Sequence, residues 1–150
     1  MKVISTSFLA LALLHAVAFA GIDADIPQTN QVILSSGAWL PSTKETQKAL
    51  AAIQAFLEKP ASTNEMSNSE IKKILANMKK YRVQFVGVVR DGNKIIWCNF
   101  FPAPRKGDGI FFSNWEQQEV RVLDGGFWFW QIDYDPGTGK CAGFVSNGYG

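Results

Sequence analysis

The sequence predicts an α+β fold with two N-terminal helices packed on one face of a four- to five-stranded antiparallel meander sheet. Between residues 41 and 80, apolar residues recur every three or four positions, as on one face of a helix. After Tyr81 the period changes to two, and turn signals separate the apolar stretches. Helices that precede a run of strands are typical of α+β proteins.

Residues 1–20 predict a cleaved signal peptide. Lys2 gives a positive start, a mainly apolar stretch follows, and Ala18 and Ala20 stand where a signal peptidase requires small residues. We therefore expect one α+β domain over residues 21–150 that is periplasmic or secreted and does not insert into the membrane after cleavage. The alternative is a membrane anchor, for which the apolar stretch is slightly short.

The first helix is predicted after an extended arm, residues 21–40, whose Trp39 docks onto the body. Ser42 and Glu45 have the capping-box spacing at its start, and Pro60 ends it. Its apolar face comprises Ala49, Leu50, Ile53, Phe56 and Leu57.

A second helix is predicted from the same spacing at Ser67 and Glu70. Its apolar stripe comprises Ile71, Ile74, Leu75 and Met78, and four lysines lie mostly away from it: Lys72, Lys73, Lys79 and Lys80. Such lysines are typical of a solvated helix face, and the alternative is a surface for an acidic partner.

The strands follow in order. Residues 81–90 alternate between apolar and polar, Asp91-Gly92 predicts a hairpin turn, and residues 94–101 are apolar on both faces, as in a central strand. Residues 119–123 are expected to resume pairing, residues 127–134 to form the longest strand, and residues 140–146 to form the last.

Strand alternation would divide the aromatic residues of 127–134 between two faces. Phe127 and Phe129 would share a face with Gln131 and Asp133, while the opposite face would carry Trp128, Trp130, Ile132 and Tyr134. We expect the second set beneath the helices, although the assignment could be reversed. The first set is then either an exposed partner site or covered by the N-terminal arm.

Two cysteines, Cys98 and Cys141, predict a disulfide bond, because an isolated pair in an exported protein commonly pairs. The single histidine is His15, inside the predicted signal peptide, which excludes nucleophile–histidine pairs and histidine-based zinc sites from the remainder. The near balance of 15 basic and 13 acidic residues argues against a nucleic-acid partner. We expect no metal and no cofactor.

Carboxylates remain the one catalytic possibility. Five of them fall in one region, Glu116, Glu119, Asp124, Asp133 and Asp135, and two acids at a suitable separation can hydrolyse a glycosidic bond. Asp133 and Asp135 could also bind calcium. A structural role is the simpler interpretation, since an aspartate before Pro136 is typical of a turn.

Several short motifs in residues 68–150 resemble those of a group of small, largely uncharacterised exported bacterial proteins. They are Tyr81, Gln84-Phe85-Val86-Gly87, Asn99-Phe100-Phe101, Trp115, Asp124-Gly125-Gly126, Tyr134-Asp135 and Asn147-Gly148. The resemblance implies a helix-on-sheet, cystatin-like architecture and no activity. Residues 84–87 lack a spacer of the inhibitory Gln-x-Val-x-Gly loop of cystatins and precede the predicted turn.

These observations predict a non-catalytic protein-binding module, an inhibitor or immunity protein against an enzyme of the cell envelope. The predicted contact residues are Arg105, Lys106, Asp108, Phe111, Phe112, Trp115, Phe127 and Phe129. The first six lie in or next to a long charged connection with apolar residues, and such connections are commonly functional. Phe127 and Phe129 belong to the strand face that could be an exposed partner site. The alternatives are a cell-wall or carbohydrate-binding protein and a carboxylate-based glycosidase.

Overall fold

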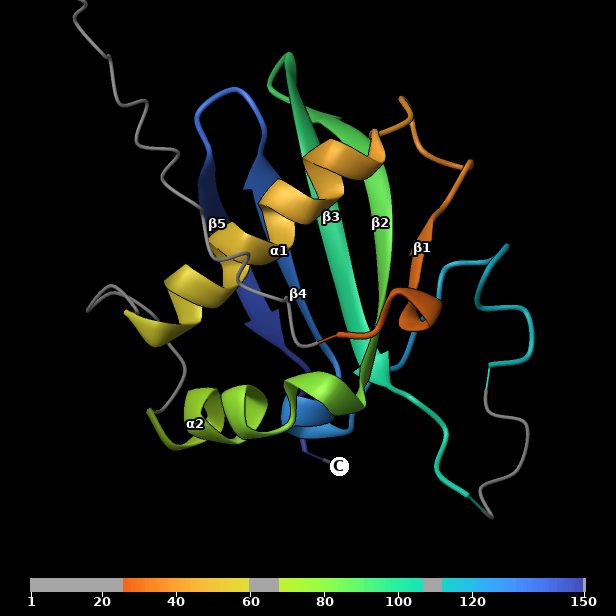
Figure 1. Cartoon of the computed structure of the whole chain (residues 1–150), viewed down its shortest axis with the longest axis vertical. Coiled ribbons are helices and arrows are strands. Elements are labelled where there is room, and N and C mark those ends of the chain that lie inside the picture. Colours follow the sequence, from red (N-terminus) through yellow and green to blue (C-terminus); the bar gives the residue numbers. More distant parts are fainter. Residues whose placement is uncertain (1–25, 60–67, 107–111, 150) are drawn as a thin grey trace, which may run out of the picture.

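The computed structural model describes residues 26–59, 68–106 and 112–149 and confirms the α+β class. Two helices accompany one five-stranded sheet in the order β1-β2-β3-β4-β5 (Figure 1). The predicted signal peptide, Pro60 and Ser67 lie outside the described residues. The elements are β1 (Gln31–Ile33), α1 (Thr43–Glu58), α2 (Asn68–Ala76), β2 (Tyr81–Arg90), β3 (Asn93–Pro102), β4 (Trp130–Asp135) and β5 (Lys140–Ser146).

The sheet is mixed, which corrects the predicted all-antiparallel meander. β1 runs parallel to β2, with Gln31 opposite Val83, whereas β2, β3, β4 and β5 pair antiparallel in chain order. The helices are therefore not both N-terminal to the strands. They lie within the crossover between two parallel strands, which a direct turn cannot join.

Local signals place the helices and the hairpin. The Ser42 hydroxyl accepts from the Glu45 amide at 3.3 Å and the Glu45 carboxylate accepts from the Ser42 amide at 2.8 Å, which confirms the predicted capping box. Asp91 and Gly92 both have positive φ, 50° and 80°, as a two-residue hairpin turn requires. The central position of β3 is also confirmed.

The main hydrophobic core lies between the sheet and the helices. α1 crosses the sheet face and α2 lies across its lower end (Figure 1). Phe100 and Trp130 stack at 3.7 Å with nearly parallel rings, and Tyr81 meets both edge-on. The strand residues of this core alternate with residues that face away from the helices: Tyr81, Val83 and Phe85 on β2, Ile96, Cys98 and Phe100 on β3, and Trp130, Ile132 and Tyr134 on β4.

The strand predicted over residues 127–134 is too long. A 3-10 turn, η3 (Gly126–Trp128), occupies its beginning, and β4 starts at Trp130. Gly125 and Gly126 have positive φ, 99° and 56°, so the chain turns here. Phe127 and Trp128 consequently both pack against the helix-side core, while Phe129 packs on the opposite face. The predicted division of faces holds only from Phe129 onward.

The predicted disulfide bond is not formed. Cys98 and Cys141 are free thiols on β3 and β5, with β4 between them. Cys98 is opposite Ile132 and Cys141 is opposite Tyr134. Strands two positions apart are separated by roughly 10 Å, whereas a disulfide requires Cα atoms within about 7 Å.

Within the described ranges, no helix has both the length and the apolar character needed to cross a membrane.

Candidate functional site

A row of four side-chain amides crosses the sheet face that points away from the helices. Gln84 and Asn99 are opposite each other on β2 and β3, and Asn99 is opposite Gln131 on β4. The Asn99 amide donates to Gln84 at 3.1 Å, and the Gln131 amide donates to Asn99 at 3.2 Å and to Asn147 at 3.5 Å. We refer to Gln84, Asn99, Gln131 and Asn147 as the amide row.

The amide row binds the backbone of residues 115–124 to the sheet. Gln84 donates to the carbonyls of Trp115 and Gln118 at 2.5 and 2.7 Å and accepts from the Val120 amide at 2.9 Å. With the bond from Asn99, the two donors and two acceptor positions of this buried amide are all used.

The other two anchoring amides hold the same segment further along. Asn99 donates to the Val120 carbonyl at 2.8 Å, and Asn147 donates to the carbonyls of Val122 and, at 3.2 Å, Asp124. Residues 119–123 were predicted to resume strand pairing, which is wrong. Their polar backbone groups bind side chains of the amide row instead of a neighbouring strand.

A second, smaller core forms beneath this segment. Phe101, Trp115 and Val120 are buried, with Val32, Phe112, Val122 and Phe129 packed around them. The Phe101 ring meets the rings of Phe112 and Trp115 at 5.6 and 6.0 Å. This face was expected to be either an exposed partner site or covered by the N-terminal arm. The arm instead pairs along the sheet edge through β1, and residues 112–123 provide the cover.

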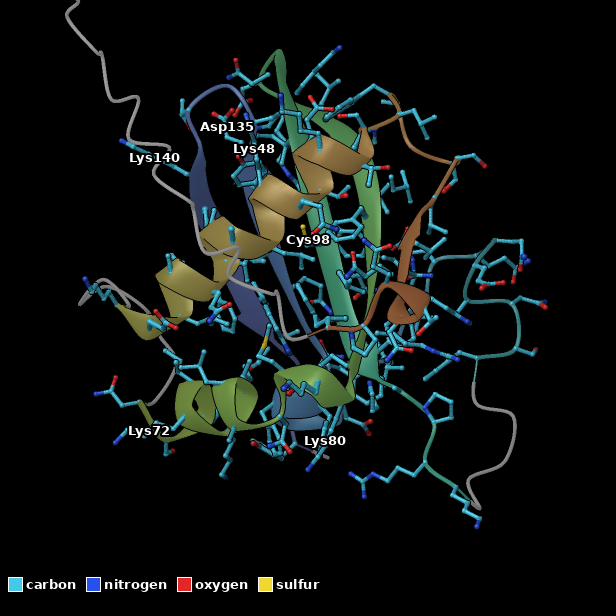
Figure 2. All side chains as sticks on the ribbon, viewed as in Figure 1. Lys48, Lys72, Lys80, Cys98, Asp135 and Lys140 are labelled. Carbon is cyan, nitrogen blue, oxygen red and sulfur yellow. The ribbon has the colours of Figure 1, made fainter. Side chains whose placement is uncertain are left out.

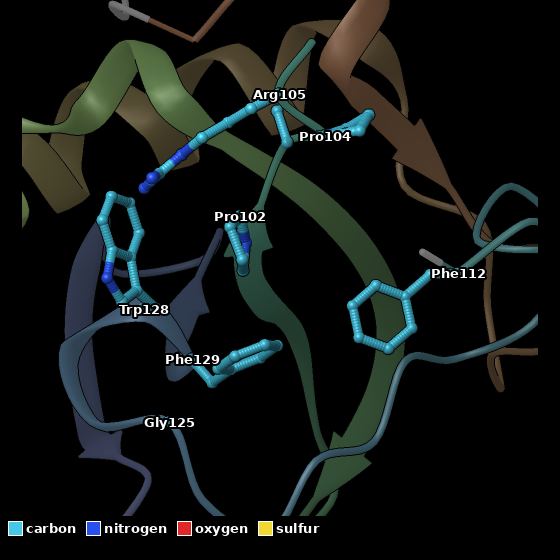
Figure 3. A pocket seen from close by; sticks show the side chains of 8 residues that line it. Pro102, Pro104, Arg105, Phe112, Gly125, Trp128 and Phe129 are labelled. Atoms are coloured by element: carbon cyan, nitrogen blue, oxygen red, sulfur yellow. The ribbon is translucent and has the colours of Figure 1, made fainter. Parts of the chain in front are cut away.

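An apolar cleft of about 290 Å³ opens where this cover meets the end of β3. One wall is the stretch from Pro102 to Arg105, and Figure 3 shows Phe112 and Trp128 on opposite sides, with Phe129 between them. Gly125 completes the lining. Arg105 is the only ionisable residue among these lining residues.

Two cations flank a pair of aromatic rings beside the cleft. The Arg105 guanidinium lies 5.2 Å from the centre of the Trp128 ring, and Lys73 Nζ lies 5.5 Å from the centre of the Phe127 ring. The two rings are 4.8 Å apart. Such cation–ring contacts are attractive, and Figure 3 shows the Arg105 side chain directed toward Trp128.

The structure separates the predicted contact residues. Arg105, Phe112 and Phe129 line the cleft together, and Lys106 is exposed beyond its wall. Trp115 is buried, with the Arg82 guanidinium 4.4 Å from its ring centre, and Phe127 belongs to the helix-side core. Asp108 and Phe111 lie outside the described residues.

Trp128 and the proline wall of the cleft were not predicted as site residues. Trp128 was assigned to a buried strand face, because its position in η3 depends on the turn at Gly125 and Gly126. The run Pro102-Ala103-Pro104 was a sequence signal that could have indicated a rigid wall.

The five carboxylates considered for catalysis are not gathered in the cleft. Asp133 pairs with Arg90 at 2.7 Å, and Glu119 pairs with Arg121 at 3.0 Å. Asp135 accepts from the amides of Gly137 and Thr138, and its hydrogen bonds with Thr138 and Gly137 lower the pKa of this carboxyl. The turn role predicted for Asp135 is therefore confirmed.

Residues 84–87 lie inside β2, and the hairpin turn comes later at Asp91-Gly92, as predicted. Gln84 is fully buried, so this motif does not form a protruding loop. In the part of the chain that is described, no three His, Cys, Asp or Glu side chains gather as a metal site would require.

The fold and cleft define a helix-on-sheet protein with a preformed apolar site. Comparisons with known protein families, curated proteins and solved structures find no significant match to this chain.

Proposed function

We propose that this protein is an exported, non-catalytic binding module that uses the cleft to hold another protein. An inhibitor or immunity protein directed at an enzyme of the cell envelope fits this role. The observation that carries the proposal is the cleft itself, whose lining is apolar apart from Arg105. Clefts with apolar linings and few polar groups are the usual form of binding sites.

The cleft has the size of an anchor site for a side chain. Its volume of about 290 Å³ is at the small end of ligand pockets. Protein interfaces commonly obtain most of their affinity from a few aromatic or aliphatic residues inserted in such pockets. The amide row supports this role because it fixes the backbone that leads to Gly125, and a preorganised site loses less entropy on binding.

Export is supported by residues 1–20 and by the resemblance to small exported bacterial proteins. The antiparallel strands β2–β5 with α1 across them also support the cystatin-like architecture that the resemblance implies. Expression of the whole chain in a bacterial host, followed by intact-mass measurement of the envelope fraction, tests export. A product that begins at Gly21 is expected, and an uncleaved chain in the cytoplasm would contradict the proposal.

Filling the cleft should abolish partner binding. Ala103→Trp places a large ring at the wall, and Ala142→Trp makes the same change at an exposed position on β5. Each tagged protein is used to recover partners from an envelope extract, with identification by mass spectrometry. We expect the wild type and Ala142→Trp to recover the same protein and Ala103→Trp to lose it. Equal recovery by both variants would assign binding to another surface.

A carbohydrate ligand is the second candidate, because Trp128 and Phe129 present rings in the cleft and sugar faces stack on such rings. Soluble peptidoglycan fragments should then change tryptophan fluorescence in the wild type and in Ala142→Trp but not in Ala103→Trp. The protein-binding proposal predicts no such change.

A further inference from the structure

We infer that the partner segment held by the cleft is acidic, with an aromatic side chain flanked by carboxylates. This inference rests on the proposed protein-binding function and names the chemistry of the partner. It derives from the distribution of charge around the cleft, which composition alone does not reveal because the whole chain carries only +2.

Basic residues concentrate at the end of the molecule where the cleft opens. Three segments meet there: α2, the 3-10 turn η2 (Met78–Lys80), and residues 102–106. They contain six basic residues, Lys72, Lys73, Lys79, Lys80, Arg105 and Lys106, against one acid, Glu70. Glu70 accepts a hydrogen bond from the Tyr149 hydroxyl at 2.8 Å. Figure 2 shows Lys72 and Lys80 at this end and Lys48, Asp135 and Lys140 at the other.

Backbone and ring contacts tie these cations to the cleft. The Ala103 amide donates to the Lys80 carbonyl at 2.8 Å, which joins η2 to the proline wall. Arg105 lies against the Trp128 ring in the cleft, and Lys73 lies against the neighbouring Phe127 ring. An acidic segment whose side chain enters the cleft would therefore meet positive charge on the side of the cleft formed by Trp128.

The form of the cleft favours a protein segment over a nucleic acid as the ligand. Phosphate binding requires a basic surface that follows the backbone of the polymer. Here the charges lie beside an apolar site of about 290 Å³, which suits one buried side chain. Charge complementarity of this kind raises association rates and selects partners.

Three blocked hexapeptides test the inference on the folded chain. The first has one Phe among Asp and Glu, the second replaces the acids with Asn and Gln, and the third keeps the acids but replaces Phe with Ala. Titrations are followed by amide chemical shifts at low and high salt, with an acidic oligonucleotide as a separate ligand. We expect the acidic Phe peptide to bind about tenfold more tightly than the neutral one at low salt, because several exposed charge pairs each contribute modestly.

Charge-reversal variants assign this difference to the basic residues beside the cleft. Lys80→Glu and Arg105→Glu should remove the preference for the acidic peptide, while Lys48→Glu and Lys140→Glu, at the opposite end, should keep it. High salt should reduce the preference in the wild type, since exposed charges are screened.

The remaining outcomes separate the two proposals. Equal affinity for the acidic and neutral Phe peptides would overturn the acidic preference and leave the cleft as a binding site. Failure of both Phe peptides to bind would count against the cleft and hence against the proposed function. Tight binding of the acidic Ala peptide, or tighter binding of the oligonucleotide, would replace the inference with a general anion-binding surface.

Discussion

Gly87 on β2 lies where the N-terminal arm crosses the sheet edge, and the contact there is between backbones. A Cβ at this position would lie 2.0 Å from the Trp39 carbonyl oxygen. Gly87→Ala must therefore displace the arm, and we expect the free energy of unfolding to fall by about 2 kcal/mol. Gly148→Ala is the control, because a Cβ there meets no atom within 4 Å. Urea denaturation of both variants measures the effect, and equal stability would show that the arm contact is dispensable.

The labelling rate of Cys141 tests whether the two cysteines are free thiols. Burial raises the pKa of Cys141 to about 11. The reactive thiolate is therefore scarce at pH 8 and reaches one half only at about pH 11, whereas an ordinary thiol is half ionised about two pH units lower. The rate of iodoacetamide labelling, followed by peptide mass, should keep rising between pH 9 and 10.5. Absence of labelling in the native protein and recovery after reduction would indicate a disulfide instead.

At the scale of elements, the amide row spans β2, β3 and β4 and ends at Asn147, directly after β5, and Gln84 makes four of its hydrogen bonds. Gln84→Met keeps the size of the side chain but leaves the carbonyls of Trp115 and Gln118 and the Val120 amide without this partner. Unpaired buried groups cost about 1–3 kcal/mol each, so we expect a loss of at least about 3 kcal/mol. Hydrogen exchange should also increase over residues 115–124.

Gln54→Met is the matched control for the amide row. Gln54 makes one hydrogen bond on the surface of α1, to Glu58 at 3.1 Å, so its loss should change stability by less than about 0.5 kcal/mol. If Gln84→Met changed the free energy of unfolding as little as the control, residues 112–123 would be held on the sheet by their apolar contacts alone.

Elements defined by neighbouring residues could be predicted from the sequence, and elements defined by distant contacts could not. The capping box at Ser42 and the turn at Asp91-Gly92 are complete within four residues, so their patterns suffice. β1 has three residues and exists only because β2 pairs with it. The hydrogen bonds of the amide row join residues up to 36 positions apart, and each member alone resembles a solvated polar strand residue.

The cleft was predictable only in part for the same reason. Arg105 and Phe112 were identified because they lie in a connection with unusual composition, and Phe129 because strand alternation placed it on a face that could be exposed. Trp128 was missed because strand alternation was expected from Phe127 onward, whereas a 3-10 turn occupies Gly126–Trp128 and β4 starts at Trp130. The predicted disulfide was wrong because β4 lies between the strands that carry the two cysteines. The number of strands between two residues depends on the topology of the sheet, which a sequence pattern does not show.

Over the whole molecule, the N-terminal arm closes an edge of the sheet that would otherwise be open along β2. Leu34 and Ala38 amides donate to the carbonyls of Phe85 and Gly87 at 2.9 and 2.7 Å, and the Trp39 indole donates to Val88 at 3.0 Å. Ile26 and Leu34 are buried. Exposed sheet edges pair readily with other chains, so the arm protects the protein from association as well as adding core contacts.

A chain that begins at Pro41 should therefore lose both stability and monomeric behaviour relative to one that begins at Gly21. Loss of the buried Ile26 and Leu34 alone should lower the free energy of unfolding by at least about 3 kcal/mol. The uncovered β2 edge should produce concentration-dependent oligomers in light scattering coupled to size-exclusion chromatography. Trp39→Phe in the longer chain removes the indole hydrogen bond but keeps an aromatic ring and the pairing of β1 with β2, so this variant should stay monomeric. A shorter chain that remained monomeric and equally stable would contradict this role of the arm.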